Sequence, residues 1–304
     1  MKIKSILALL FAFIMCFTFM TGCNKKSDED TSTADEAKST ASTLEKTEDA
    51  PKEPFSILLV GIDDFNDLGN SDAILLLSID DANRKLKITS FNRNTYVYIP
   101  GFDNANLSKA YTFGQADLLV KTIEDNFGAE INRYALANLF SFEDMLNAVG
   151  GVEMTLNEEE IAYINNMMKA NGKTQQIESG AGTVTLSGEQ ALCHVRNLSE
   201  GDEFLRAGRQ REFIKALIAT FKKATVTELT SMASLAIPML NTDMTTEEKV
   251  SLVNKIMTYL NYTVEECSMP SEGTYDVAGG MSDPRIIVND WNKTKSDLNT
   301  FLYD

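Results

Sequence analysis

Short apolar runs alternate along this chain with longer segments of helical periodicity, and that alternation limits the fold more than any other feature. Ser56–Gly61 is almost wholly apolar and ends in glycine, which is typical of a strand buried on both faces. Ala73–Ile79 is a second such run, and Leu86–Phe91 follows it after the turn Asp80–Asn83, so these two runs predict a β-hairpin. The two aspartates of that turn are interpreted as turn residues only.

Helix-capping patterns mark most of the segments that follow. Ala116–Phe127 has helical periodicity and stops at a glycine, and Ser187 with Gln190 has the spacing of a capping box. Further helices are expected from Ser141 to Gly150, from Asn157, over Glu203–Lys223, from Thr245 and from about Asp290, and further strands over Arg133–Ala137 and Tyr262–Met269. Strands that alternate with helices predict an α/β layered fold with a mixed sheet.

The N-terminal part of the chain differs in composition from the rest. A basic start precedes the apolar run Ile6–Phe19, which is too short to span a bilayer comfortably, and Thr-Gly stands just before Cys23. We therefore interpret residues 1–22 as a lipoprotein signal peptide and Cys23 as the lipidated residue, with an uncleaved anchor as the alternative. Residues 23–54 have the composition of a disordered acidic, Ser/Thr-rich tether, and residues 55–304 suit one folded domain.

Cationic side chains are scarce, so their placement carries information. The formal net charge is −16, and nucleic acid is not expected as a partner of so acidic a chain. The planar fork of arginine suits bidentate contact with phosphate, although a surface ion pair is the alternative for each one. The candidate phosphate-binding residues are Arg93, Arg196, Arg206, Arg209 and Gln210.

Arg206 and Gln210 are four residues apart on one expected helix, so they share a face. Phe213 and Leu217 continue that face inward, and Arg209 lies at its flank. Both polar residues fall in the first turns of the helix, where free backbone N–H groups favour anions. This spacing indicates a site for a phosphate group.

Two carboxylates accompany the arginines. Asp63 follows one buried strand and Asp72 opens the next, and ligands of open α/β sheets gather at strand ends. Mg²⁺ is commonly held by one or two carboxylates together with phosphate oxygens of the substrate. Carboxylates near converging arginines are what metal-assisted phosphoryl transfer requires. A solvated loop acid is the alternative for each, and Asp64 is the alternative to Asp63.

Cysteine and histidine indicate no separate centre. Cys193 and Cys267 are far apart in sequence, and we favour free thiols over a disulfide. His194 is the sole histidine, so a structural role is favoured over catalysis.

Six blocks of the chain occur in an order that resembles the LytR-CpsA-Psr family. They are SDAILLLSID, FNRNTYVYIPG, LSKAYTFG, FSFEDMLNAVGGVEMTL, LSGEQALCHVRN and EFLRAGRQ, and the resemblance covers roughly Phe55–Phe221. It implies an α/β/α sandwich with a central mixed β-sheet. It also implies a phosphotransferase that moves a glycopolymer from a polyprenyl pyrophosphate carrier to peptidoglycan, at the outer face of the bacterial cytoplasmic membrane.

The resemblance also implies roles for the candidate residues. Asp63 and Asp72 would hold Mg²⁺, with Mn²⁺ as the alternative ion. Arg93, Arg196 and Arg206 would stabilise charge in the transition state, and Asp72 is the candidate base. The lipid tail would enter an apolar pocket, for which ordinary core is the alternative interpretation of the candidate residues Leu119, Ile123, Phe127, Leu139, Phe142, Leu146, Phe213 and Leu217.

The chain departs from the family pattern at several positions where a cation or its neighbour is usual. These positions are Asn70, Asn92, Asn94, Asn106, Leu198 and Leu205, although Lys109 lies close to Asn106. Each lost charge-assisted contact removes roughly 1.5–3 kcal/mol. A non-catalytic paralogue that binds the lipid pyrophosphate or regulates wall assembly is therefore the alternative, and a solute-binding lipoprotein unrelated to phosphate is a third reading.

Overall fold

The computed structural model describes residues 53–63, 69–197, 203–229, 241–280 and 283–304. Cys23, the signal peptide and most of the tether lie outside these residues, as do Asp64 and Leu198. Among the helices described, none is both long enough and apolar enough to cross a membrane.

A six-stranded mixed sheet forms the centre of the domain, in the order β10-β3-β2-β1-β6-β9. β1 pairs antiparallel with β2 and parallel with β6, while β3 pairs antiparallel with β2 and parallel with β10. The predicted hairpin and the predicted mixed sheet are both confirmed. The strands are β1 Phe55–Ile62, β2 Ser71–Asp80, β3 Lys85–Phe91, β6 Arg133–Ala137, β9 Asn241–Thr242 and β10 Thr263–Met269.

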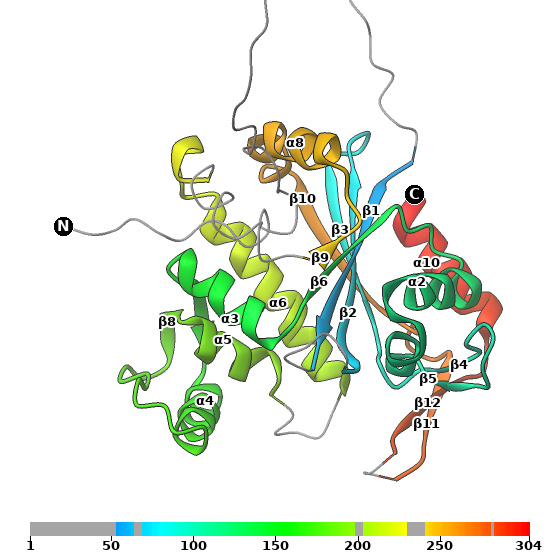
Figure 1. Cartoon of the computed structure of the whole chain (residues 1–304), viewed down its shortest axis with the longest axis horizontal. Helices are drawn as coiled ribbons and strands as arrows, with labels where there is room; N and C mark the ends of the chain where they lie inside the picture. The colour runs from blue at the N-terminus through cyan, green and yellow to red at the C-terminus, as the bar shows by residue number, and fades with distance from the viewer. Residues whose placement is uncertain (1–52, 64–68, 198–202, 230–240, 281–282) are drawn as a thin grey trace, which may run out of the picture.

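Helices cover both faces of this sheet, which gives an α/β/α sandwich (Figure 1). Helices α2 (Ser108–Phe127) and α10 (Trp291–Tyr303) lie on one side, and α3 (Leu139–Ala148), α5 (Gly188–Val195) and α6 (Glu203–Phe221) lie on the other. The remaining helices are α4 (Glu158–Ala170), α8 (Thr246–Asn254) and α9 (Ile256–Tyr259).

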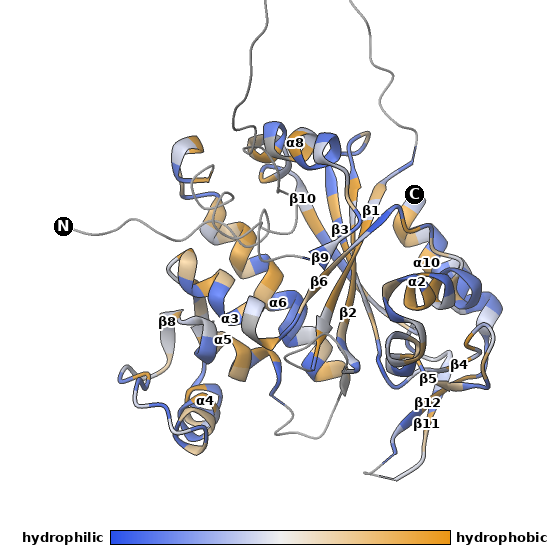
Figure 2. Cartoon of the chain, in the orientation of Figure 1, coloured by the Kyte–Doolittle hydropathy of each residue, from blue (hydrophilic) through white to orange (hydrophobic). Residues whose placement is uncertain are grey.

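Both faces of the central strands are buried, as their apolar runs predict. Ile57 and Leu59 belong to the core under α3, α5 and α6, whereas Leu58 and Val60 belong to the core under α2 and α10. Figure 2 shows hydrophobic residues on the central strands and on stripes of the flanking helices. Successive side chains of a strand point to opposite faces, so one apolar run supplies two cores.

Three two-stranded sheets outside the main sheet, among the residues described, were not predicted. They pair β4 (Tyr96–Val97) with β5 (Ala105–Asn106), β7 (Val152–Leu156) with β8 (Gly182–Leu186), and β11 (Tyr275–Ala278) with β12 (Arg285–Val288). Strands this short carry little periodicity of their own, and their pairing depends on distant segments.

Most predicted helix starts are confirmed, with two corrections. Ser187 and Gln190 form the expected capping box. Helix α3, however, is capped by Asn138, and Ser141 is the third residue of the helix rather than its start. Helix α2 begins at Ser108, earlier than predicted, because it continues across a kink at Gly114 and Gln115.

The prediction that Asp80 serves only the turn is wrong. Its carboxylate accepts hydrogen bonds from Asn83 N and Nδ2, both at 2.9 Å, and it also pairs with Lys87 Nζ at 3.2 Å. Asp80 is buried and Lys87 is fully buried, and the lysine donates to the carbonyl oxygen of Leu302 at 2.8 Å. The pair therefore joins the end of α10 to the sheet.

Both cysteines of the domain are free, so the favoured reading of their state is confirmed. Cys193 is buried and Cys267 is half-buried, and burial raises the pKa of each thiol. Neither thiol is poised to react at neutral pH.

Candidate active site

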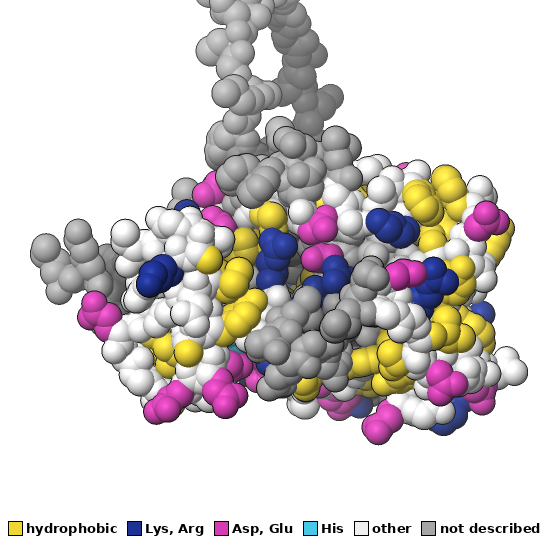
Figure 3. Space-filling view, turned by 90° about the horizontal axis from the view of Figure 1, so that it is seen from below, with side chains coloured by type: hydrophobic (Ala, Val, Ile, Leu, Met, Phe, Trp, Pro, Cys, Tyr) yellow, Lys and Arg dark blue, Asp and Glu magenta, His cyan; other side chains and the backbone are white. Residues whose placement is uncertain are grey.

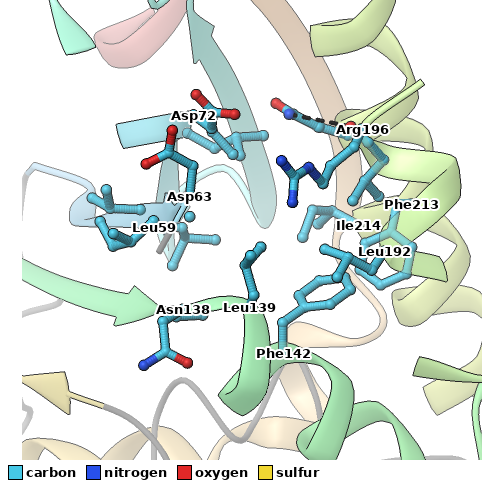
Figure 4. Close-up of a pocket in the computed structure, with 18 of the residues that line it drawn as sticks. Leu59, Asp63, Asp72, Asn138, Leu139, Phe142, Leu192, Arg196, Phe213 and Ile214 are labelled. Carbon is cyan, nitrogen blue, oxygen red and sulfur yellow. Dashed lines mark hydrogen bonds between the residues drawn. The ribbon is translucent and has the colours of Figure 1, made fainter. Parts of the chain in front are cut away.

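An apolar pocket lies between the sheet and helices α3, α5 and α6 (Figure 4). The strands and helices contribute Ile57, Leu59, Leu75, Leu77, Leu139, Phe142, Leu192, Val195, Phe213, Ile214 and Leu217 to its lining. The floor runs from the Ile57–Leu77 pair of β1 and β2 to the Gly61–Ala73 pair. Four residue steps of a strand span roughly 13 Å, so the pocket is a slot suited to an extended hydrocarbon chain.

The mouth of this slot is polar. Asp63, Asp72, Arg196, Arg206 and Gln210 all belong to the lining at the end where β1 stops. In Figure 4 the two aspartates lie on one side of the mouth and Arg196 on the other. Viewed from this end of the molecule, basic and acidic side chains lie next to one another near the middle of the surface, beside hydrophobic ones (Figure 3). The site is thus amphiphilic.

The two carboxylates sit together because β1 and β2 are neighbours. The register shifts after Gly61, so that Ile62 pairs with Ser71, and Asp63 and Asp72 flank that last pair. The backbone N–H of Asp63 donates to the carbonyl oxygen of Asn70 at 3.1 Å. The predicted placement of both acids at strand ends is confirmed.

Asp63 and Asp72 fit a magnesium ion by the chemistry of their donors. Both offer carboxylate oxygens, which Mg²⁺ prefers. Within the described ranges, no group of three or more His, Cys, Asp or Glu side chains is placed to hold a metal ion, so the protein would supply two carboxylates. Phosphate oxygens and water would complete the coordination.

Asp72 also brings two of the predicted arginines together. Arg93, just beyond β3, forms an ion pair with one carboxylate oxygen of Asp72 through Nη1. Arg206, on the first turn of α6, places Nη1 3.8 Å from the other oxygen and donates from Nη2 to the backbone carbonyl at 3.1 Å. Residues from β2, from the segment after β3 and from α6 therefore meet at the Asp72 carboxylate.

The remaining polar candidates separate into two groups. Arg196, an exposed residue at the end of α5, and Gln210 both line the slot. Arg209 does not. Its Nη1 donates to the carbonyl oxygen of Asn197 at 3.1 Å, and its Nε lies 3.9 Å from Glu160. Arg209 is three residues after Arg206, so its side chain points about 60° away from the face that Arg206 and Gln210 share. Its role in substrate binding stays a prediction.

The candidate lining residues for the lipid tail are only partly correct. Leu139, Phe142, Phe213 and Leu217 line the slot, and Leu146 lies in the adjoining core. The prediction is wrong for the three residues of α2, because that helix covers the opposite face of the sheet; these are Leu119, Ile123 and Phe127. Helical periodicity shows which side of a helix is buried, but not against which face of a sheet.

Some residues at which the chain departs from the family pattern have structural partners. Asn92 Oδ1 accepts from Asn94 N at 3.0 Å, and both side chains are buried. Asn106 Nδ2 donates to the carbonyl oxygen of Pro284 at 3.1 Å, which ties the β4–β5 segment to the turn before β12. These amides support the backbone around Arg93 and do not add charge to the mouth.

Sequence reasoning gave no role to a group of residues around Asn70. Its side-chain oxygen accepts from Lys109 Nζ at 2.9 Å and from Thr112 Oγ1 at 3.0 Å. Its backbone N–H donates to Asp63 Oδ1 at 2.5 Å. The signals in the sequence were that Asn70 stands where the family usually carries arginine and that Lys109 stands near a position where the family carries lysine.

His194 takes no part in this site. It is 2 % exposed and does not line the slot. Burial lowers the pKa of its imidazole, and neither ring nitrogen has a hydrogen-bond partner among the described residues. The neutral ring therefore packs as part of the core.

The fold is an α/β/α sandwich with a mixed sheet, and its apolar slot ends at a mouth of paired carboxylates and arginines. These features define a class of proteins that bind an amphiphile with an anionic head group. The chain belongs to the LytR_cpsA_psr family, whose sequence profile matches residues 16–294. The family resemblance and the α/β/α fold expected from it are confirmed.

Two similar proteins are teichoic acid transferases. The chain is 32% identical over 176 residues to the polyisoprenyl-teichoic acid–peptidoglycan teichoic acid transferase TagT of Bacillus subtilis, covering 56% of this chain and 53% of TagT. It therefore spans about half the length of that relative. It is 31% identical over 230 residues to the corresponding transferase TagU of Enterococcus faecalis, covering 71% of each protein.

A solved structure of TagT with bound octaprenyl pyrophosphate lipid has a similar fold. The TM-score is 0.63 at 26% identity, and the match covers 83% of this chain and 91% of that one. Another solved structure, TagT bound to LIIa-WTA, gives a TM-score of 0.66 at 26% identity, with the same coverage.

Proposed function

We propose that this protein transfers a glycopolymer from a polyprenyl pyrophosphate carrier to peptidoglycan. The observation that carries this proposal is the slot, whose apolar walls end at a mouth of arginines and carboxylates. A polyprenyl chain needs the first environment and a pyrophosphate needs the second. The names of the relatives support the same reaction.

Each part of the site has a task in this reaction. The apolar walls hold the lipid tail and exclude water from it. Arg93, Arg196 and Arg206 bind the pyrophosphate and stabilise the charge that develops on its oxygens, because guanidinium donors fixed in advance need no reorganisation. Gln210 orients the head group, and Arg209 is a further candidate contact at the flank.

The bond changes follow from the chemistry of a diphosphate. An acceptor hydroxyl oxygen of peptidoglycan attacks the phosphorus that bears the glycopolymer. A P–O bond to the acceptor forms, the P–O bond to the bridging oxygen breaks, and polyprenyl monophosphate leaves with the bonding electrons. The hydroxyl proton passes to a carboxylate at the mouth, which we assign as Asp72.

The carboxylates of Asp63 and Asp72 would hold a divalent ion, Mg²⁺ or alternatively Mn²⁺. When bound, such an ion supplies neutralising charge to the phosphate oxygens. EDTA should then abolish transfer, and Asp72→Ala should match the EDTA result. Transfer that continues at an unchanged rate in EDTA would contradict the metal assignment.

Membrane attachment is part of the proposal. Cys23 would carry a lipid, and the domain would work on the outer face of the cytoplasmic membrane, where lipid-linked glycopolymer and peptidoglycan meet. The acidic chain, with a formal net charge of −16, is not expected to bind nucleic acid.

A second candidate function is binding without turnover. It is favoured by Asn92, Asn94 and Asn106, which form hydrogen bonds within the protein where the family pattern has charged residues or proline. Fewer cations at the mouth would lower the stabilisation of the transition state more than the attraction for the lipid tail.

One experiment separates the two functions. The full chain is incubated with a polyprenyl-pyrophosphate-linked disaccharide and a peptidoglycan oligomer in Mg²⁺, and the joined product is sought by mass spectrometry. Product that depends on the divalent ion supports transfer. Saturable lipid binding without product supports the second function, and absence of lipid binding contradicts both.

A further inference from the structure

Asn70 connects a candidate metal ligand to a helix on the far side of the sheet. Its backbone N–H donates to Asp63 Oδ1 at 2.5 Å, and its side-chain Nδ2 lies 3.4 Å from Asp63 Oδ2. The backbone N–H of Asp63 donates in return to the carbonyl oxygen of Asn70 at 3.1 Å. Asn70 and Asp63 are thus joined by reciprocal hydrogen bonds at the point where β1 ends and β2 begins.

The orientation of the Asn70 amide is determined by its other contacts. Its Oδ1 accepts from Lys109 Nζ at 2.9 Å and from Thr112 Oγ1 at 3.0 Å. Two donors on one side require the amide oxygen there, so the NH₂ group must face Asp63. Thr112 Oγ1 also lies 3.3 Å from the carbonyl oxygen of Gly69, the residue before Asn70.

Lys109 and Thr112 stand on the first turns of α2, which are set apart from the rest of that helix. Gly114 and Gln115 break the helical backbone directly after them, and Gln115 has φ 56° and ψ −155°. A non-glycine residue in this region is strained and persists only where surrounding contacts hold it. Gly114 cannot take a side chain, because a Cβ there would lie 2.7 Å from Leu118. The turns before this break carry Lys109 and Thr112, which both contact Asn70.

We propose that Asn70 is a positioning residue that orients the carboxylate of Asp63 toward a divalent ion, and that Lys109 and Thr112 hold Asn70 in place. The proposal rests on the proposed function, since it assigns Asp63 to the metal. Residues that hydrogen-bond to metal ligands commonly change metal affinity by 10- to 100-fold when removed. The exposed bonds from α2 should each contribute less than the bond network of Asn70 itself.

The sign of the Lys109 effect makes the test sharp. If Lys109 acted only through its positive charge, it would repel a divalent ion, and Lys109→Met would increase the affinity for that ion. If Lys109 acts by orienting Asn70, the same substitution weakens binding. Thr112→Val removes a donor without any change of charge and should weaken binding as well.

The experiment measures Mn²⁺ affinity by calorimetry on the full chain in detergent, alone and with farnesyl diphosphate. We expect affinity to fall about tenfold in Asn70→Leu and roughly two- to fivefold in Lys109→Met and Thr112→Val. Lys109→Arg keeps a hydrogen-bond donor at this position and should therefore keep the Mn²⁺ affinity of the wild type. The control is Lys121→Met, which removes the same charge from an exposed lysine of α2 that pairs with Asp125.

Different outcomes separate this proposal from the proposed function. Unchanged Mn²⁺ affinity in Asn70→Leu and Thr112→Val, or tighter binding in Lys109→Met, overturns the positioning role and leaves the transferase proposal intact. If the wild type binds Mn²⁺ no more tightly than Asp63→Ala does, both the metal assignment and this proposal are wrong. Thermal unfolding of each variant shows whether a loss of affinity instead reflects loss of the fold, which would also count against a positioning role.

Discussion

The guanidinium of Arg206 lies against Asp72, with Nη1 3.8 Å from the carboxylate and Nη2 donating to the backbone carbonyl at 3.1 Å. Arg206 is 4 % exposed, so this contact is largely shielded from water. Arg93 binds the other oxygen of the same carboxylate. One acid therefore holds two cations, one from the segment after β3 and one from α6, at the mouth of the slot.

This arrangement fixes the arginines before any anion arrives. A buried cation without a partner is costly, and Asp72 offsets that cost in the free protein. A pyrophosphate could then take over donors that are already aligned, which is the condition for strong electrostatic stabilisation. The same pairing means that Asp72 must exchange partners if it is to bind a metal ion.

Arg93→Ala should weaken binding of a polyprenyl pyrophosphate by roughly 1.5–3 kcal/mol, because it removes a charge-assisted contact at the mouth. Calorimetry with a short-chain analogue measures this loss. Stability should change little, because Arg206 stays against the Asp72 carboxylate when Arg93 is removed. As a contrast, Arg133→Ala, which breaks a pair with Glu248 away from the slot, should lower the melting temperature without changing binding. The reverse pattern would make Arg93 a structural residue.

Ala73→Phe should block the slot. Ala73 is half-buried in its lining, opposite Gly61, so an added ring would occupy the space that we assign to the lipid next to its head group. Native mass spectrometry should show at least a tenfold loss of lipid binding, about 1.4 kcal/mol. Ala224→Phe makes the same change at a half-buried alanine after α6 that does not line the slot. Equal lipid binding by both variants would show that the tail lies elsewhere.

His194 should make the fold sensitive to acid. Burial lowers the pKa of His194 below its ordinary value of 6.5, so the unfolded chain binds a proton that the folded chain excludes. Stability from this residue is present above pH 6.5 and is lost as the pH falls from there toward the folded pKa. His194→Leu removes the proton uptake, so urea unfolding at pH 7 and pH 5 should differ less than in the wild type. The same pH dependence in both proteins would assign the acid sensitivity to carboxylates.

Cys23→Ala should release the protein from the membrane or change its processing, because the lipobox-like Thr-Gly-Cys sequence would no longer accept a lipid. Labelling with a fatty acid in the native host measures this directly. A Cys193→Ala variant, which alters a buried thiol of the domain, should retain the label. Absence of label in the wild type would show that Cys23 is not lipidated.

Much of the fold could be predicted because its signals are local. The apolar run of β1 and the β2–β3 hairpin were read from residues adjacent in sequence, and the capping box of Ser187 and Gln190 joins residues three apart. Arg206 and Gln210 were placed on one face by helical spacing alone, and both line the slot. The order of the six blocks also identified the family.

Contacts between distant segments were not accessible in this way. Arg209 was grouped with the binding residues, yet it lies beside Glu160, which belongs to a different helix. Leu119 looked like a wall of the pocket but lies on the other face of the sheet. The link from Lys109 through Asn70 to Asp63 joins α2 to the β1–β2 connection, and no periodicity encodes it.

The sequence by itself determined the family, the mixed α/β fold and which polar residues stand at strand and helix ends, because hydrophobic alternation and capping act between near neighbours. Only the tertiary structure decided which face of the sheet forms the slot, which acid holds Arg93 and Arg206, and how Asp63 is supported. Those features depend on how helices pack across the sheet, which brings together side chains from elements that are distant in sequence.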